Sequence, residues 1–388
     1  MEKRIRVALN RFERTPHSLK HVSTANSATD EITVNLASLY HHYYLDSYDK
    51  RPPDPDPANF EYLKDLLPTQ DFRFRGAGAG ASSMARRTIS SHLGQAFCRW
   101  FLHDHLNIKY FARIEDVLNG EISRDFSGLT IERATSGDTP DYFCAESVDK
   151  VFLAEAKGRY TSVSFANRAF SNWRKQFDRV VARDLSGTPL SLKGYIVATR
   201  YATEKNRLSL KSTLFAEDPR SPGDVPLSEK RGTDVGLVVL AKHYAGIADK
   251  LSQPILSSAL NLGFLVPEEI RFPVTVWEIV VGPLKGVRFV GGYYPGSPEE
   301  LPIRQIDGQI TIVSADPFRL DRGAGTFFGL EETIFSTVCQ LVRSPAIAGL
   351  EVGSFSQIEP FYSGVSILKD GSIIGPLEFF RPIEPAVY

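Results

Sequence analysis

The chain has 388 residues, of which 42% are hydrophobic and 23% are charged, and its formal net charge at pH 7 is -1. These values are typical of a globular protein of two or three domains that forms its core without metal or disulfide crosslinks. A charge this close to zero excludes attraction of nucleic acid by the protein as a whole, so any basic surface must be local.

Targeting and membrane signals are not evident. No run of 18 or more apolar residues is present, so we expect no membrane span. The first nine residues alternate charged and apolar side chains and lack the apolar segment of a signal peptide. The three cysteines, Cys98, Cys144 and Cys339, are far apart and form no zinc or disulfide pattern. We therefore expect a reduced, cytoplasmic setting.

The first region covers residues 1–75. Alternation over residues 4–9 predicts a strand. Four prolines between residues 52 and 57 exclude helix and central strand there, because proline fixes φ and has no N–H donor. They predict a rigid surface loop. The sequence indicates no role for this region.

The second region covers residues 76–245 and begins with a glycine-rich joint, Gly76-Ala-Gly-Ala-Gly80. Apolar side chains at four-residue spacing predict a helix over 83–103. Further apolar runs predict strands at 129–134, 141–145 and 151–156 with a turn at 147–149, a second helix at 165–182, and buried strands at 195–198 and 235–240. The order of helix, three strands, helix and strand predicts an α/β fold with a mixed sheet flanked by helices.

The third region covers residues 246–388 and is predicted to be an α+β module. Apolar runs predict strands at 274–281, 287–290 and 310–313 and a helix at 331–342. The pair Asp370-Gly371 between apolar segments predicts a hairpin. We expect this module to select substrate, to bind a protein partner, or to join copies of the chain.

Three residues of the second region have the chemistry of a metal-dependent hydrolase. Asp141 and Glu155 lie at equal distances from the predicted turn, so a hairpin would place them opposite each other. Two facing carboxylates repel unless a cation lies between them, and a hard cation such as Mg²⁺ prefers oxygen ligands. Lys157 projects from the same strand face as Glu155. The alternative interpretation is a solvated hairpin with a surface salt bridge.

The pattern Pro140-Asp141, then Glu155-Ala-Lys157, resembles the PD-(D/E)XK, or restriction-endonuclease-like, nuclease superfamily. The resemblance covers residues 83–240. It implies a restriction-endonuclease-like mixed sheet, Mg²⁺ (with Mn²⁺ as a substitute) bound by Asp141, Glu155 and the carbonyl of Ala156, and a catalytic Lys157. It also implies a site role for Gln176 on the helix after the third core strand. The chain departs from the family on the first helix, where Gln95 stands in place of a glutamate.

Basic residues follow this pattern, and Arg159, Arg174 and Lys175 are candidates for binding the phosphates of nucleic acid. The alternative is an ordinary solvated helix face. Elsewhere, His103 and His105 could share a metal ion, but the sequence shows no third ligand, and a structural role is favoured.

Two functions follow from these features. The first is Mg²⁺-dependent hydrolysis of DNA, in a restriction or anti-phage system by family analogy. The second is a non-catalytic nucleic-acid or partner-binding protein that retains the nuclease fold. The intact set of Asp141, Glu155 and Lys157 favours the first, and the missing glutamate on the first helix favours the second.

Overall fold

The structure is a computed structural model that describes residues 2–21, 27–50, 52–118, 130–183, 186–220, 233–295, 303–306, 309–312, 325–344, 355 and 364–388. The chain divides into two compact units. One unit comprises residues 2–47 and 61–243, and the other comprises residues 48–60 and 244–388. Among the described helices, none combines the length and the apolar character needed to cross a membrane.

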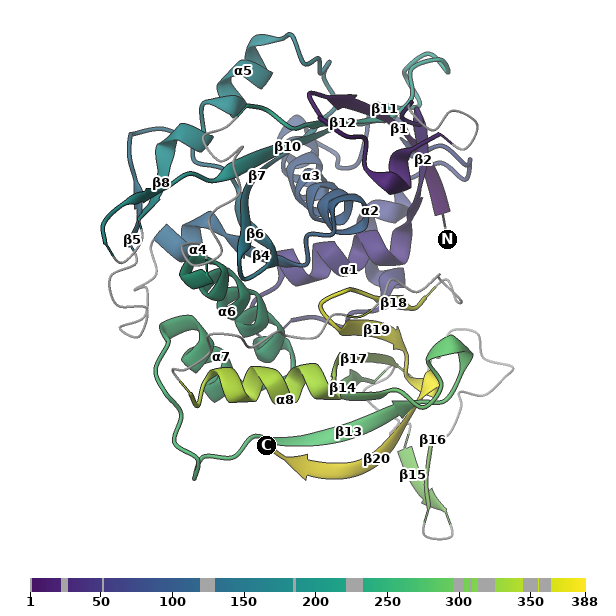
Figure 1. Ribbon diagram of the computed structural model, residues 1–388. Coiled ribbons are helices and arrows are strands. Elements are labelled where there is room, and N and C mark those ends of the chain that lie inside the picture. Colours follow the sequence, from purple (N-terminus) through teal and green to yellow (C-terminus); the bar gives the residue numbers. More distant parts are fainter. Residues whose placement is uncertain are drawn as a thin grey trace. The chain divides into compact units, whose positions relative to one another are not determined.

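The first unit is built on a seven-stranded mixed sheet with the order β2-β1-β12-β10-β7-β6-β4. Its strands are β1 (Glu2–Asn10), β2 (Glu31–Asn35), β4 (Tyr110–Arg113), β6 (Tyr142–Ser147), β7 (Lys150–Arg159), β10 (Lys193–Arg200) and β12 (Thr213–Glu217). β7 pairs antiparallel with β6 and parallel with β10. The predicted α/β class, with a mixed sheet flanked by helices, is confirmed (Figure 1).

The helices of this unit are α1 (Leu36–Ser47), α2 (Glu61–Lys64), α3 (Ser83–Leu106), α4 (Ile114–Leu118), α5 (Arg168–Arg174) and the first part of α6 (Thr233–Lys250). Short strands β3 (Arg73–Phe74) and β11 (Ala202–Thr203) pair with each other. A three-stranded sheet contains β5 (Thr130–Arg133), β8 (Val180–Arg183) and β9 (Pro189–Leu190).

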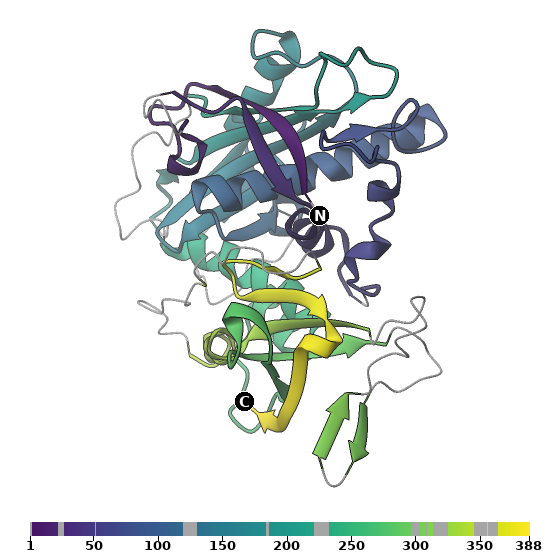
Figure 2. The ribbon, with the colours of Figure 1, turned by 90° about the vertical axis from the view of Figure 1, so that its right-hand side faces the viewer.

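Helix α3 packs on β7 and β10, and α1 packs on α3 (Figures 1 and 2). The helix begins where the side chain of Ser82 accepts a hydrogen bond from the amide of Ala85, and it ends at Asn107, whose φ of 58° is left-handed. Leu93, Phe97 and Phe101 are fully buried, as the predicted apolar stripe requires. The predicted first helix is therefore confirmed.

Two predictions about secondary structure are wrong. The predicted helix over 165–182 ends at Arg174, and a 3-10 turn and strand β8 follow it, because the β-branched Val180 and Val181 pair with β5. The apolar run at 235–240, predicted as a strand, lies inside helix α6. A short apolar run does not by itself distinguish a buried strand from a buried helix.

The N-terminal region is not a unit of its own. Strand β1, predicted from its alternation, pairs in parallel with β12 about 200 residues later and antiparallel with β2. The proline loop belongs to the other unit, and residues 52–56 form no helix or strand there, as predicted.

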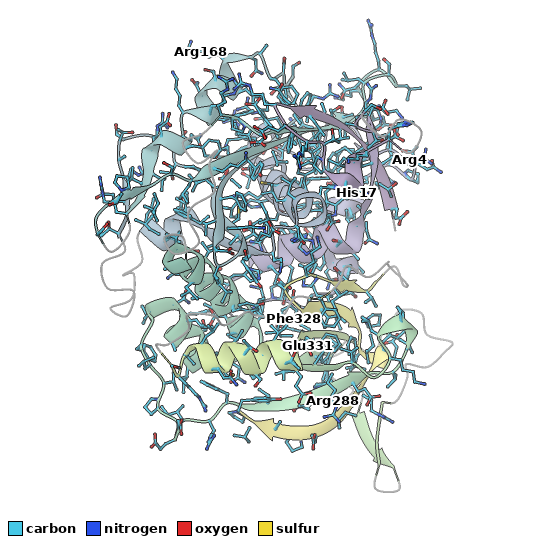
Figure 3. All side chains as sticks on the ribbon, viewed as in Figure 1. Arg4, His17, Arg168, Arg288, Phe328 and Glu331 are labelled. Atoms are coloured by element: carbon cyan, nitrogen blue, oxygen red, sulfur yellow. The ribbon has the colours of Figure 1, made fainter. Side chains whose placement is uncertain are left out.

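The second unit contains a six-stranded antiparallel sheet with the order β18-β19-β17-β14-β13-β20. The elements of the second unit are the last part of α6, α7 (Pro254–Leu262), β13 (Pro273–Ile279), β14 (Arg288–Tyr294), β15 (Ile303–Ile306), β16 (Gln309–Ile312), β17 (Thr326–Glu331), α8 (Glu332–Leu341), β18 (Ser366–Ile367), β19 (Ser372–Pro376) and β20 (Phe380–Val387). Strands β15 and β16 pair with each other in a separate sheet. The predicted strands, helix and Asp370-Gly371 hairpin of the third region are present. Glu331, at the end of β17 (Figure 3), caps α8 by accepting from the amide of Ile334 at 2.9 Å.

Candidate active site

The hairpin of β6 and β7 sets Asp141 and Glu155 opposite each other. Its turn falls at residues 148–149, and its register pairs Tyr142 with Ala154. Asp141 directly precedes β6: its amide donates to the carbonyl of Ala154 at 3.0 Å and its Oδ2 accepts from the amide of Ala156 at 2.7 Å, so Asp141 lies alongside Glu155. The predicted relation of the two carboxylates is therefore present.

Successive side chains of β7 project to opposite faces of the sheet. At Gly158 the strand faces α3, because a Cβ there would lie 1.6 Å from the carbonyl oxygen of Ser90. The side chains of Glu155, Lys157 and Arg159 consequently project from the other face. On that face, the guanidinium of Arg159 lies 4.8 Å from the ring centre of Trp173 in α5. The candidate site therefore lies on the α5 side of the sheet.

Lys157 contacts both carboxylates. Its Nζ is 2.5 Å from Glu155 Oε1 and 3.6 Å from Asp141 Oδ2. Asp141 Oδ2 also accepts a hydrogen bond from the amide of Ala156 at 2.7 Å, which fixes the aspartate against β7. The Glu155 side chain is completely buried, whereas the side chains of Asp141 and Lys157 are 25% and 27% exposed. The cluster thus opens to solvent through Asp141 and Lys157.

The carboxylates of Asp141 and Glu155 repel each other within the cluster. Burial and the nearby charge of Asp141 raise the pKa of Glu155 well above its usual range, and Lys157 only partly offsets them. Neither carboxylate oxygen of Glu155 accepts a well-directed hydrogen bond, so the attraction to the Lys157 ammonium is chiefly coulombic despite the short distance. Burial opposes the charge of Lys157, yet the two carboxylates outweigh it and raise the pKa of Lys157.

These residues fit a divalent cation. Buried carboxylate oxygens without hydrogen-bond partners, facing a second carboxylate, are the donor set that a hard cation requires. Lys157 Nζ already provides positive charge between them, and its partial exposure allows it to move aside.

Gln176 and Gln95 are placed differently. Gln176 lies just after α5, on the same side of the sheet as the side chain of Glu155, and is 4% exposed. Its Oε1 is buried without a hydrogen-bond partner. Gln95 is half-buried on α3, which covers the opposite face. Gln176 thus lies on the face from which Glu155 and Lys157 project, and Gln95 lies on the helix that covers the other face.

The three predicted phosphate-binding residues do not share one environment. Arg174 forms a two-point ion pair with the fully buried Glu217, through Nε at 2.5 Å and Nη2 at 2.8 Å. Arg174, predicted to bind phosphate, is thus paired with an acid of the chain. Arg159 is half-buried against Trp173, and burial lowers its pKa. Lys175 is exposed. Arg168, at the start of α5, is exposed as well (Figure 3).

Sequence reasoning missed Glu217. It ends an apolar run, Leu214-Phe-Ala216, and this is the same kind of signal that singled out Glu155. A buried acid at such a position requires a cationic partner, and here the partner is Arg174.

Comparisons with known proteins add no family: no family model, curated protein or solved structure matches the chain.

Proposed function

We propose that the chain is a Mg²⁺-dependent nuclease that hydrolyses phosphodiester bonds of DNA. One observation carries the proposal: Lys157 Nζ contacts the carboxylates of both Asp141 and Glu155 at the open end of a hairpin. A surface salt bridge does not account for this cluster, because Glu155 is completely buried and lies beside the second carboxylate of Asp141.

The order of elements supports a restriction-endonuclease-like fold. After α3, the seven-stranded sheet takes the antiparallel strands β4, β6 and β7, with α4 and β5 between β4 and β6, and then, after α5, β8 and β9, the strand β10 beside β7. The strand predicted at 129–134 is β5, which lies in the three-stranded sheet, and β4 takes its place. In the family that the sequence resembles, the aspartate begins the second core strand and the acid-x-lysine lies on the third. Asp141 directly precedes β6, and Glu155 and Lys157 lie on β7.

Asp141 and Glu155 would hold the metal. A bound Mg²⁺ would supply charge neutralisation at the phosphate and a bound water of lowered pKa. The chain itself contributes orientation, because the hydrogen bond from the amide of Ala156 fixes Asp141. Gln176 adds a buried amide oxygen on the same side of the sheet.

The role of Lys157 follows from its charge. The two carboxylates raise its pKa, so the amine stays protonated at neutral pH. A protonated amine cannot accept a proton from water, but it stabilises negative charge that develops on the phosphate. With a metal ion on Asp141 and Glu155, Lys157 lies beside both ligands, where it would orient the attacking water or stabilise charge on the phosphate.

The alternative function is binding of nucleic acid or of a protein partner without cleavage. Two observations favour it. Gln95 stands on the first helix where the resembled family has a glutamate, and Arg174 forms an ion pair with Glu217 instead of being available to phosphate. The second unit would then provide most of the binding surface. A role in restriction or anti-phage defence is part of the proposal only through the family resemblance.

Nuclease assays test the proposal. Supercoiled plasmid, linear duplex, single-stranded DNA and RNA are incubated with the protein in Mg²⁺, Mn²⁺ or EDTA. We expect cleavage of DNA in both metals, none in EDTA, and none by Glu155→Gln. Asp138→Asn is the matched control, because Asp138 is an exposed acid in the loop before Asp141. Binding of DNA without cleavage in either metal would support the alternative. Cleavage by Glu155→Gln at the wild-type rate would overturn the proposed site.

A further inference from the structure

A second group of candidate metal ligands lies in the first unit and shares no residue with the proposed nuclease site. It consists of His42 on α1 and of His103 and Asp104 on α3. One ligand atom from each side chain lies within 4.8 Å of the other two. Among the described residues, this is the one group of three or more histidines, cysteines or acids that meets this condition.

His42 is the member of the group whose ring nitrogens lack hydrogen-bond partners. It is 1% exposed, and neither Nδ1 nor Nε2 has a hydrogen-bond partner. Its ring stands edge-on to that of His103, with 4.8 Å between the centres. A buried imidazole with two unpaired nitrogens is costly unless something binds to it.

His103 and Asp104 are consecutive on α3, yet the polar ends of their side chains lie next to each other. His103 Nδ1 lies 2.7 Å from Asp104 Oδ1. His103 is 3% exposed, and the Asp104 side chain is 17% exposed. The group therefore combines two buried imidazoles with one carboxylate that solvent can reach.

We propose that His42, His103 and Asp104 bind a divalent transition-metal ion, of which Zn²⁺ is the best match. Two imidazoles and one carboxylate with an open fourth position form a donor set typical of Zn²⁺, whose bonds to nitrogen and oxygen are about 2.0–2.2 Å long. Ligand atoms on such an ion are about 3.3 Å apart. The ligand atoms lie within 4.8 Å of one another, so side-chain rotations that bring them closer by up to about 1.5 Å would form the site, and the 2.7 Å contact of His103 Nδ1 with Asp104 Oδ1 would give way to the ion.

The surrounding charges allow a cation. Arg99, a turn earlier on α3, is near His42, but its Nη1 lies 3.2 Å from Asp46 Oδ1. Asp46 also pairs with Arg113 at 3.7 Å, so it offsets the charge of Arg99 only in part, and Asp104 adds a negative charge within the group itself. An ion bound here joins α1 to α3. Because α3 packs on β7, the ion would stabilise the sheet that holds Glu155 and Lys157.

The test uses the full chain with Asp141→Asn and Glu155→Gln, so that metal cannot bind at the proposed nuclease site. The protein is stripped with chelator, dialysed against Zn²⁺ or Co²⁺, and analysed for metal content, visible absorption of Co²⁺ and thermal unfolding. We expect one ion per chain and a rise in the unfolding midpoint of about 5 °C at saturating metal.

Three variants in the same background identify the ligands. We expect His42→Phe and Asp104→Asn to abolish stoichiometric binding and the thermal shift. Asp104 is partly exposed and asparagine has the same shape, so this variant tests the site even if His42→Phe folds poorly. His105→Gln is the matched control: His105 lies on the same helix but contacts Ser18, and binding should persist. Absence of bound metal, or binding unchanged by Asp104→Asn, would overturn the proposal.

Discussion

Gly158 of β7 lies directly against the carbonyl of Ser90 in α3: a Cβ on Gly158 would be 1.6 Å from that oxygen. On the helix side, a Cβ on Gly94 would be 2.3 Å from the amide nitrogen of Gly158. The two backbones thus touch at the residue that follows Lys157. This contact sets the depth at which α3 packs against the strand that holds Glu155 and Lys157.

Gly158→Ala should destabilise the protein, because neither the strand nor the helix backbone can yield without displacing the other. We expect a loss of about 1–3 kcal/mol in the free energy of unfolding, the usual cost of overpacking. Urea denaturation measures it. Gly246→Ala is the control, because Gly246 lies inside α6 and a Cβ there meets no atom within 4 Å. That variant should gain about 0.5–1 kcal/mol. Equal stability of Gly158→Ala and wild type would contradict the close contact.

Asp141→Asn should abolish DNA cleavage and preserve the fold. The asparagine carbonyl can still accept the hydrogen bond from Ala156, but it contributes no charge to a metal ion. We expect the cleavage rate to fall by more than roughly 100-fold, the upper end of what losing a residue behind the metal ligands costs. Stability without metal should be unchanged or slightly higher, since repulsion of Glu155 is removed. Plasmid cleavage and thermal unfolding, with Asp138→Asn alongside, measure both effects. A variant that unfolds would show Asp141 to be structural instead.

Lys157→Met should extend to higher pH the range over which stability falls as pH rises. Lys157 partly offsets the burial and the Asp141 charge that raise the pKa of Glu155, so its loss raises that pKa further. A raised pKa means that the folded state binds more protons than the unfolded state above the ordinary value of 4.5. Stability is then greatest at low pH and falls as pH rises, by at most about 1.4 kcal/mol per pH unit for one proton.

Urea denaturation of Lys157→Met at pH 5, 6, 7 and 8 measures this slope. The comparison is the double variant Lys157→Met with Glu155→Gln, in which the titrating carboxyl is gone and histidine titration is unchanged. We expect the free energy of unfolding of the double variant to lose this dependence on pH. Parallel curves for the two variants would mean that Glu155 is not the group responsible.

Local pattern was sufficient to predict the hairpin, because Asp141 and Glu155 are 14 residues apart and equally far from one turn. It was not sufficient for Arg174, whose partner Glu217 is 43 residues away. It also failed to join residues 1–75 to the sheet, since β1 pairs with β12 across about 200 residues. Contacts at such separations depend on the folded topology, and a single sequence does not contain a periodic signal for them.

Histidine pairing shows the same limit. Closeness along the chain suggested His103 and His105 as a possible metal-binding pair, with a structural role favoured, yet the ring beside His103 is that of His42, from another helix. His105 turns instead toward Trp100 and Ser18. The prediction of a helix over 165–182 was wrong for a different reason. The apolar stripe continues through Val180, but the β-branched residues there pair with β5.

Arg174→Ala should reduce stability rather than DNA binding. The variant leaves the carboxylate of Glu217 buried, and among the described residues the side-chain amide of Asn10 still donates to it at 2.7 Å. We expect a loss of about 3 kcal/mol, the lower end for breaking a buried pair, because Arg174 is itself 24% exposed. Arg174→Ala combined with Glu217→Gln should recover part of the loss. Urea denaturation measures both variants, and a single variant as stable as wild type would show that the pair contributes nothing.

Lys175→Ala should weaken DNA binding without reducing stability. Lys175 is exposed at the end of α5, on the same side of the sheet as Glu155 and Lys157, so its ammonium can reach a phosphate of a DNA strand held there. Each phosphate contact releases counterions, and losing one should flatten the salt dependence by about 0.9 on duplex DNA. Fluorescence anisotropy between about 50 and 200 mM salt measures this slope, in an Asp141→Asn background that cannot cleave. Lys205→Ala, at an exposed turn after β11, is the matched control and should keep the slope. If Lys175→Ala and Lys205→Ala bind alike at every salt concentration, α5 does not contact DNA, and the phosphates are held by another surface of the chain.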